Sequence, residues 1–538
     1  MGWLYRVVRN IVEKFRMNGD SHVVLYIKRA YSGYFALIPD NLDIDNHLRN
    51  YPLVDYSAFE LNGDKILSSK GLKFDKDKLM YLIGLISAIP AKNKDSITKD
   101  GFIPLNSTYL QKFFKDYKDY LDYLIDTGII ISDGYYIPEE KSIGYKFSEI
   151  YENTDLVRYS YRRFENSIEP IEESVYNEDT GDFERNQLLD CSYLSHWYNE
   201  RKLRIDYQKA KEYGRILKNK KLQEGQEAWD INRDSGEKKN PISQYNALIY
   251  NVEAVQTHDY KAKIDSNIHR LHSVLTNIQK DYRNFITYDG QPLVSIDIKN
   301  SQPYLVSALT NPNFWSNTNP NLKFSQMPNN IQGLFNTPTT FNITPISIML
   351  GNFFDNLSPS DFDEYKRIVS SGEMYETVQR WILEEKEIDI SREDAKTTMF
   401  TLIFSSNRDN PNDENHWLKV YYREKFPSIA ELFKIIKRQY KGVDRKKQHA
   451  RLACLLQSIE SEIVLHRCCK RIWEEGEQQV PIFTIHDSIV TTKGNEDFVK
   501  RIMEEELTRA IGVPPTLQVE EWRENKLKHQ DILIQINS

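Results

Sequence analysis

The sequence predicts an α+β protein of several domains, and three observations support this class. The chain has 538 residues, of which 40% are hydrophobic and 28% are charged. This composition is typical of a soluble globular protein, and at ~100–200 residues per domain the length allows about three or four domains. Helical periodicity followed by a hairpin signal marks a module in the N-terminal half, and β-type runs that lead to aspartates mark the C-terminal half.

Charge and cysteine content narrow the possible functions. Lysine and arginine total 71 against 78 acidic residues, a formal net charge of −7, which argues against polyanion binding by the whole surface but permits a local basic groove. Four cysteines without a Cys-x-x-Cys spacing form no disulfide framework, so we expect a reducing, cytoplasmic location. No run approaches the ~18 apolar residues of a membrane span, so we expect no membrane partner.

The N-terminal part divides into a first segment, 1–75, and a small module, 76–164. Three segments of the module have the pattern of helices: 79–88, 107–114 and 117–125. Asp133-Gly134 then lies between two β-type runs, as in a hairpin. Three helices and a hairpin resemble a winged helix, which contacts DNA through its third helix and wing or serves a structural or protein-binding role. The aspartates of the third helix favour the second role.

Charge changes sign along the middle of the chain. Residues 165–184 carry eight acidic and no basic side chains, which predicts an acidic linker. Two basic runs follow, 201–221 with nine Lys/Arg and 434–451 with eight. A basic run is usually a solvated helix face, but two of them favour a phosphate-binding groove. Residues 310–346 are rich in Asn, Pro and Thr and predict a long loop excursion.

Three β-type runs in the C-terminal half place two aspartates near strand ends. One run delivers Asp297 just before a helix start, and two others flank His486-Asp487-Ser488 in a hairpin. If both aspartates lie at strand ends of one sheet, their carboxylates can hold two Mg²⁺ ions about 3.5–4 Å apart. A single strand-end aspartate would be a weak signal, because aspartate is a common turn former.

A third segment repeats cations and aromatic rings at four-residue intervals. Arg392, Lys396, Phe400 and Phe404 would drift by only about 40° per step on a helix, so they form one stripe. Two cations suit a triphosphate, and two rings suit a base or sugar. The alternative is an ordinary amphipathic helix whose phenylalanines belong to the core.

In order and chemistry these segments resemble the palm and fingers of family A DNA polymerases and of the single-subunit phage-type RNA polymerases. Residues 297–302 are similar to the first palm motif, and Arg392, Lys396 and Phe400 are similar to the fingers motif. His486-Asp487-Ser488 is similar to the last palm motif of the RNA enzymes. Phe404-Ser405 departs from the Tyr-Gly of the fingers motif.

Two further positions carry the resemblance, which covers roughly 185–538. Arg270 resembles the arginine of a primer–template segment, although the glycine that normally precedes it is absent. Gln457 resembles the glutamine that contacts the terminal base pair. We expect His486 to contact the primer–template together with Arg270 and Gln457. The resemblance implies a right-hand fold whose parts are a helical thumb-like region (185–265), a first part of the palm (266–345), fingers (346–450) and a second part of the palm (451–538).

The resemblance also implies a mechanism and partners. Asp297 and Asp487 would bind two Mg²⁺ ions, for which Mn²⁺ is a possible substitute. Arg392 and Lys396 would grip the triphosphate, with Lys396 as a proton donor to pyrophosphate, while Phe400 packs on the nucleotide. The implied partners are a nucleic-acid primer–template and dNTPs.

The choice between dNTPs and NTPs depends on the position five residues after Asp297. The bulky Gln302 stands there and favours dNTPs, whereas Ser488 matches the RNA enzymes. The N-terminal residues contain only Asp43-Ile-Asp45 as a possible exonuclease motif. We therefore expect a DNA-dependent DNA polymerase without 3′–5′ exonuclease, of a phage or mobile-element type. A single-subunit RNA polymerase or primase, and a replication initiator with a vestigial palm, remain alternatives.

Overall fold

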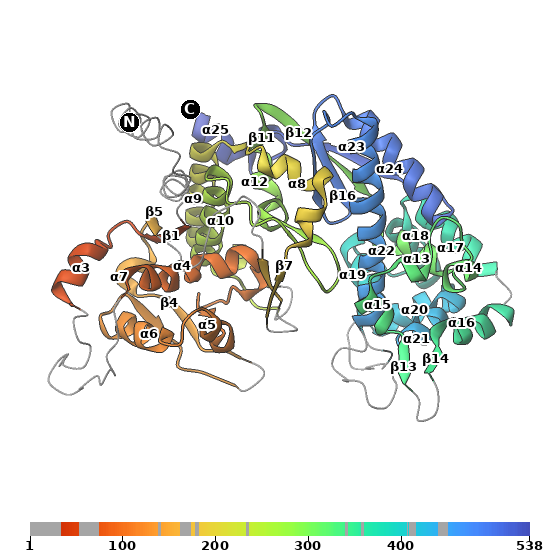
Figure 1. The fold of residues 1–538 in the computed structure, drawn as a ribbon, viewed down its shortest axis with the longest axis horizontal. Coiled ribbons are helices and arrows are strands. Elements are labelled where there is room, and N and C mark those ends of the chain that lie inside the picture. The colour runs from red at the N-terminus through yellow and green to blue at the C-terminus, as the bar shows by residue number, and fades with distance from the viewer. Residues whose placement is uncertain are drawn as a thin grey trace, which may run out of the picture.

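The computed structural model describes residues 34–52, 75–137, 141–161, 174–177, 182–232, 236–338, 343–356, 360–405, 407, 416–438 and 450–537. Helices predominate, and the strands form one six-stranded sheet and several smaller ones. In Figure 1 the N-terminal module lies on one side, the larger sheet is central, and a helical body lies on the other side. The predicted α+β class is confirmed as a mixture of helix and sheet.

The N-terminal module contains the three predicted helices and a three-stranded sheet. The helices are α4 (Lys76–Lys92), α5 (Ser107–Phe113) and α6 (Tyr117–Asp126). The strands are β2 (Ile103–Pro104), β3 (Ile130–Ser132) and β4 (Gly144–Phe147), in the order β2-β4-β3. Asp133 stabilises the β3–β4 connection, because its carboxylate accepts hydrogen bonds from the backbone of Tyr135 and Gly144. A separate pair, β1 (Tyr34–Pro39) and β5 (Leu156–Tyr161), packs beside α4.

The two aspartates at 43 and 45 serve local structure in this module. Asp43 caps α3 (Ile44–Asn50) by accepting from the backbone of Asn46, and Asp45 pairs with Lys76. The motif therefore lies at a helix start rather than in a loop. Its carboxylates already have partners within the protein.

The module is packed against the helical region that follows it. Helix α10 (Pro241–Gln256) contacts both α4 and α9 (Tyr207–Glu224). Asn251 of α10 donates to the carbonyl of Ala91 at 3.1 Å, and Lys239 pairs with Asp95 at 2.7 Å. These contacts join the N-terminal module to the region predicted as thumb-like. Most of the acidic 165–184 segment lies outside the described residues.

The central sheet is arranged around one strand. Strand β12 (Gln291–Ile298) pairs antiparallel with β16 (Ser488–Thr492), with β17 (Leu517–Glu521) and, at its start, with β11 (Ile286–Tyr288). Strand β15 (Ile482–Ile485) extends the sheet beyond β16, and β8 (Leu203–Ile205) pairs with β11. Helix α24 (Glu496–Ile511) contacts β12, β16 and β17. The predicted runs around both aspartates therefore belong to one sheet.

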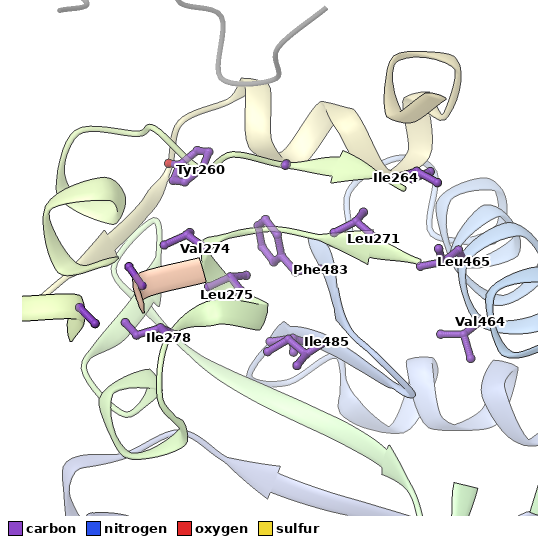
Figure 2. Close-up of a cluster of buried hydrophobic side chains, with 14 of the residues drawn as sticks. Tyr260, Ile264, Leu271, Val274, Leu275, Ile278, Val464, Leu465, Phe483 and Ile485 are labelled. Carbon is purple, nitrogen blue, oxygen red and sulfur yellow. The ribbon is translucent and has the colours of Figure 1, made fainter. Parts of the chain in front are cut away.

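A hairpin next to this sheet is anchored by a buried apolar cluster (Figure 2). The hairpin consists of β9 (Lys263–Ile264) and β10 (Leu271–His272), and α11 (Val274–Asn277) follows it. Ile264 and Leu271 of the hairpin, Val464 of the π-helical η7 (Glu462–Cys468), and Phe483 of β15 are each at most 2% exposed. Because these side chains pack together, the hairpin is held close to the strand that leads to His486.

The Asn/Pro-rich 310–346 region differs from the predicted long loop. It contains α14 (Pro312–Trp315), α15 (Asn329–Gly333) and a ribbon of β13 (Asn336–Pro338) and β14 (Ile343–Pro345). Asn311 accepts from the backbone of Asn313, and Pro312 occupies the first turn of α14. The residue types that indicate loops also favour helix starts, and here they start short helices.

The short helices α7 (Glu149–Glu152), α8 (Ser192–Asn199), α12 (Lys280–Arg283) and α25 (Gln530–Asn537) lie outside the helical body. Nine other described helices build the body that carries the cationic stripe or connect it with the sheet. They are α13 (Ser301–Leu309), α16 (Ile346–Asp355), α17 (Ser360–Ser371), α18 (Met374–Lys386), α19 (Arg392–Phe404), α20 (His416–Lys425), α21 (Pro427–Ile436), α22 (Arg451–Ser461) and α23 (Cys469–Glu475). Helix α22 continues through η7 into α23 and runs from this body towards the sheet (Figure 1). None of the described helices is long and apolar enough to span a membrane.

Candidate active site

Asp297 and Asp487 are neighbours in the central sheet. In the antiparallel register of β12 and β16, Asp297 lies opposite Ser488, and Asp487 directly precedes that serine. Directly opposed residues in such a pair have Cβ atoms about 4.5–5.5 Å apart. The two aspartates, 190 positions apart in the sequence, therefore come together at the end of one strand pair.

Asp297 and Asp487 are both half-buried. Burial raises the pKa of Asp297, although the neighbouring hydroxyls of Ser488 and Ser295 oppose this. Burial also raises the pKa of Asp487, where a hydrogen bond from Ser301 opposes the rise and the charge of Asp297 adds to it. Lys280 acts on Asp297 and Arg270 acts on Asp487, yet burial still raises both pKa values, so a metal cation bound between the carboxylates would favour their charged forms.

This donor set fits a hard divalent ion. Mg²⁺ is usually held by one or two carboxylates, with substrate phosphates and water supplying the other oxygens. Asp297 and Asp487 are the residues that would hold it. Among the described residues, no cluster of three or more His, Cys, Asp or Glu side chains is arranged to hold a metal, so substrate and water would complete the coordination.

Tight turns at both strand ends orient the site. Asn300 and His486 have left-handed backbone conformations, with φ of 52° and 55°. Such conformations are uncommon for residues other than glycine and persist only where the surroundings impose them. The turn at Asn300 starts α13. Ser301 can therefore hydrogen-bond to Asp487, and the Gln302 side chain is only 5% exposed.

Gln302 and Arg270 meet at a residue that sequence reasoning missed. Glu460 of α22 accepts a hydrogen bond from Gln302 Nε2 at 2.9 Å and pairs with Arg270 Nη2 at 2.7 Å. Glu460 lies three residues after Gln457, hence on the same face of the helix. This spacing, combined with the resemblance of Gln457, was the available sequence signal. Gln457 is half-buried one turn earlier.

The predicted stripe lies on one face of α19. Ser391 starts this helix with a capping box to Asp394. Ala395, Met399 and Ile403 are buried in the core, whereas Arg392 and Lys396 are exposed or partly exposed. The rings of Phe400 and Phe404 are 5.3 Å apart, and Lys396 Nζ lies 5.9 Å from the Phe400 ring. The four residues therefore form a continuous surface of charge and rings.

Tyr375 of α18 connects this stripe with the aspartates. The Arg392 guanidinium lies 5.2 Å from the Tyr375 ring and is bonded to Glu376 at 2.6 Å. Burial raises the pKa of Tyr375, Arg392 opposes the rise, and Asp487 adds to it. Tyr375 therefore lies within electrostatic range of both Arg392 and Asp487.

His486 is a neutral side chain next to this site. Desolvation, with the positive charge of Arg270 as the next cause, lowers its pKa to about 4. The His486 side chain is solvent-accessible at the hairpin tip. Its pKa is therefore lowered by the protein that surrounds this turn and not by complete burial of the imidazole. A neutral imidazole can both donate and accept hydrogen bonds, which suits contact with a base or sugar.

Comparisons with known proteins add little to this geometry. No protein-family model matches the chain, and no curated protein matches it. Among solved structures, the chain is similar to the POL domain of Pol1 from M. smegmatis in complex with DNA primer-template and dNTP. The likeness covers 63% of this chain and 70% of that one, at 12% identity and a TM-score of 0.31. A similarity this low carries no argument about function, which must come from the site.

Proposed function

We propose that this protein is a template-directed nucleotidyl transferase that uses two metal ions, and specifically a DNA-dependent DNA polymerase. The observation that supports this most is the meeting of Asp297 and Asp487 at the end of one strand pair, with Tyr375 within electrostatic range of both Asp487 and Arg392 of α19. Paired carboxylates together with phosphate-binding cations are the requirement of phosphoryl transfer, in which positioning and charge neutralisation do most of the catalysis. The family A resemblance of these residues agrees with the proposal.

The protein's own groups have distinct roles in this proposal. Asp297 and Asp487 hold Mg²⁺, which when bound lowers the pKa of the attacking 3′-hydroxyl and neutralises phosphate charge. Arg392 exchanges Glu376 for a phosphate oxygen, and Lys396 donates a proton to the pyrophosphate. The rings of Phe400 and Phe404 support the nucleotide. Arg270, Gln457 and His486 contact the end of the primer–template duplex.

Gln302 supports the choice of dNTPs. Its side chain is held five residues after Asp297 by the bond to Glu460, so it cannot move aside easily for a ribose 2′-hydroxyl. Ser488 donates to the Ile485 carbonyl and lies opposite Asp297, which is a structural role compatible with either sugar. The incoming substrates in this proposal are therefore dNTPs.

The N-terminal module is proposed to be a winged helix with a structural or protein-binding role. Its helix order and its β2-β4-β3 sheet agree with that topology. Asp122 on the exposed side of α6 would repel a phosphate backbone. With Asp43 and Asp45 engaged in a helix cap and an ion pair, we propose no proofreading site there. A cytoplasmic, phage or mobile-element setting is part of the same proposal.

Primer extension tests the proposed function directly. The protein is offered primed and unprimed templates with Mg²⁺ or Mn²⁺ and with dNTPs or NTPs, beside Asp297→Asn and Asp487→Asn. Asp289→Asn is the matched control, because Asp289 is exposed in a turn of the same sheet, with φ of 50°, which asparagine tolerates.

Each result of this experiment has a defined meaning. We expect dNTP incorporation on primed templates by the parent and by the control, and none by the two site variants. Incorporation of NTPs alone, or synthesis on unprimed templates, would assign the chain to the RNA polymerase or primase class. Template binding without any incorporation would favour a vestigial initiator.

A further inference from the structure

We infer that Glu460 is a positioning residue that joins the sugar side of the nucleotide site to the primer–template arginine and fixes the orientation of the Gln302 amide. This inference rests on the proposed function and adds a specificity-determining residue to it. It concerns a side chain that lies outside the polymerase-like motifs of the sequence.

Glu460 occupies a position where three separate segments meet. It belongs to the last turn of α22, is 1% exposed, and lies two residues before the start of the π-helical η7. π-Helical turns inside longer helices are frequent at functional sites, because they displace side chains from the regular helical positions. The side chains that reach Glu460 come from the β9–β10 hairpin and from α13.

A single carboxylate oxygen serves both partners. Glu460 Oε2 accepts from Arg270 Nη2 at 2.7 Å and from Gln302 Nε2 at 2.9 Å. A charge-assisted bond of this kind is about twice as strong as a neutral one. Movement of either partner therefore affects the other through the shared oxygen.

The hydrogen bond to Glu460 also determines which polar atom of the Gln302 amide can bind a ligand. A carboxylate accepts hydrogen bonds and repels a carbonyl oxygen, so Gln302 must turn its NH₂ group towards Glu460. Its Oε1 is then left as a buried acceptor without a partner among the described residues. A glutamine held in this way offers a ligand only an acceptor, as a carboxylate would, and it is suited to receive a hydrogen bond from the 3′-hydroxyl of a dNTP sugar while its bulk still excludes a 2′-hydroxyl.

Unpartnered polar atoms concentrate around this contact. Of the fourteen buried side-chain N and O atoms without a hydrogen-bond partner in the described residues, five belong to Arg270, Asn300, Gln302 and Glu460. Buried polar atoms in folded proteins are satisfied in roughly 90% of cases or more, so a local excess calls for a missing partner. A bound nucleotide and template end would supply these partners.

Two double-mutant cycles test the inference. The first measures dNTP-over-NTP discrimination in the parent, Glu460→Ala, Gln302→Ala and the double variant. The second measures primer–template affinity by fluorescence anisotropy in the parent, Glu460→Ala, Arg270→Ala and their double variant. Glu460→Gln is the conservative variant, because its carbonyl can still accept both donors. Glu474→Ala, exposed on α23, is the matched control.

We expect Glu460→Ala to lower both quantities by about tenfold, since removing one member of a buried pair leaves the other uncompensated. The loss of discrimination should disappear in the Gln302→Ala background, and the loss of affinity should disappear in the Arg270→Ala background. Glu460→Gln should restore most of both, and Glu474→Ala should change neither. Thermal unfolding of each variant separates these effects from loss of the fold.

Additive effects in both cycles would overturn the inference while leaving the polymerase function intact. A parent that binds primer–template but incorporates nothing would refute the proposed activity, and the affinity cycle would then still decide whether Glu460 positions Arg270. A parent that binds no nucleic acid would overturn both claims.

Discussion

Two helices of this protein use their basic side chains in opposite ways. On α9, Lys209, Arg215, Lys220 and Lys221 form ion pairs of 2.6–2.9 Å with Glu524, Glu212, Asp531 and Asp230. On α19, Lys396 has no acidic partner among the described residues and lies against Phe400, while Arg392 has one partner, Glu376.

The difference shows that a basic run does not by itself indicate a nucleic-acid surface. Helix α9 overlaps the 201–221 run, which favours a phosphate-binding groove. Most of its cations instead form ion pairs with acidic residues near the C-terminus or in nearby segments. Helix α19 has as many acidic as basic residues, but its Lys396 has no acidic partner among the described residues. Part of the second run, 439–449, lies outside the described residues. Pairing within the fold therefore decides which charges are available to a ligand.

The largest expected effect separates the two helices. Lys396→Ala should lower the rate of nucleotide incorporation by about 10²–10³-fold, the usual cost of removing one group that stabilises transition-state charge. Lys220→Ala on α9 should stay within about twofold of the parent, since Lys220 pairs only with exposed Asp531. Single-turnover primer extension measures both. Equal losses in the two variants would remove the distinction between the helices.

Glu460, which is buried and paired with Arg270, should make stability depend on pH in a way that the surface charges of α9 and α19 do not. Burial raises the pKa of Glu460 from 4.5 to about 7, so between these values the folded protein binds a proton that the unfolded chain has lost. Stability from this group is therefore present below pH ~4.5 and is lost as the pH rises towards ~7. Relative to the parent, Glu460→Gln should gain up to about 3 kcal/mol in free energy of unfolding across that range. Urea unfolding at several pH values measures the gain, and a constant difference would contradict it.

Unlike Lys396, Arg392 of α19 is paired with an acidic residue, Glu376. We expect this ion pair to compete with nucleotide binding. Arg392→Ala should raise the KM for nucleotide about tenfold, because a charge-assisted phosphate contact is lost. Glu376→Gln should lower the KM, because Arg392 no longer has to leave a carboxylate. Steady-state kinetics with varied dNTP concentration checks both directions. A higher KM in both variants would mean that Glu376 supports the site instead of competing for Arg392.

The smallest effect is expected on α9. Lys209 and Glu524 are about one-third exposed and 2.7 Å apart, and exposed pairs contribute about 0.2–1 kcal/mol. A double-mutant cycle with Lys209→Ala and Glu524→Ala should give a coupling in that range by chemical denaturation. Primer–template affinity should not change in any of the three variants. A clear loss of affinity would place α9 on the nucleic-acid surface after all.

Local patterns predicted much of the secondary structure and the candidate residues. The helices from Ser107 and from Tyr117, the β3 strand and the capped α19 all follow from spacing and capping residues within a few positions. The long loop expected at 310–346 was wrong, because asparagine and proline start helices as readily as they form turns. Glu460 was missed because its spacing from Gln457 indicates only a shared helix face and does not reveal that the carboxylate will be buried beside Arg270.

The sequence by itself determined the order of the motifs, the residue types at each strand end and the helical stripe of α19, because these depend on periods of two to four residues. Only the tertiary structure decided that Asp297 and Asp487 are neighbours and that Glu460 joins Arg270 and Gln302. It also decided that four cations of α9 form ion pairs with carboxylates. Lys209 and its partner Glu524 are 315 positions apart. Such contacts arise from the packing of the whole chain, and the energy of a charge depends on the partner and the burial that this packing provides.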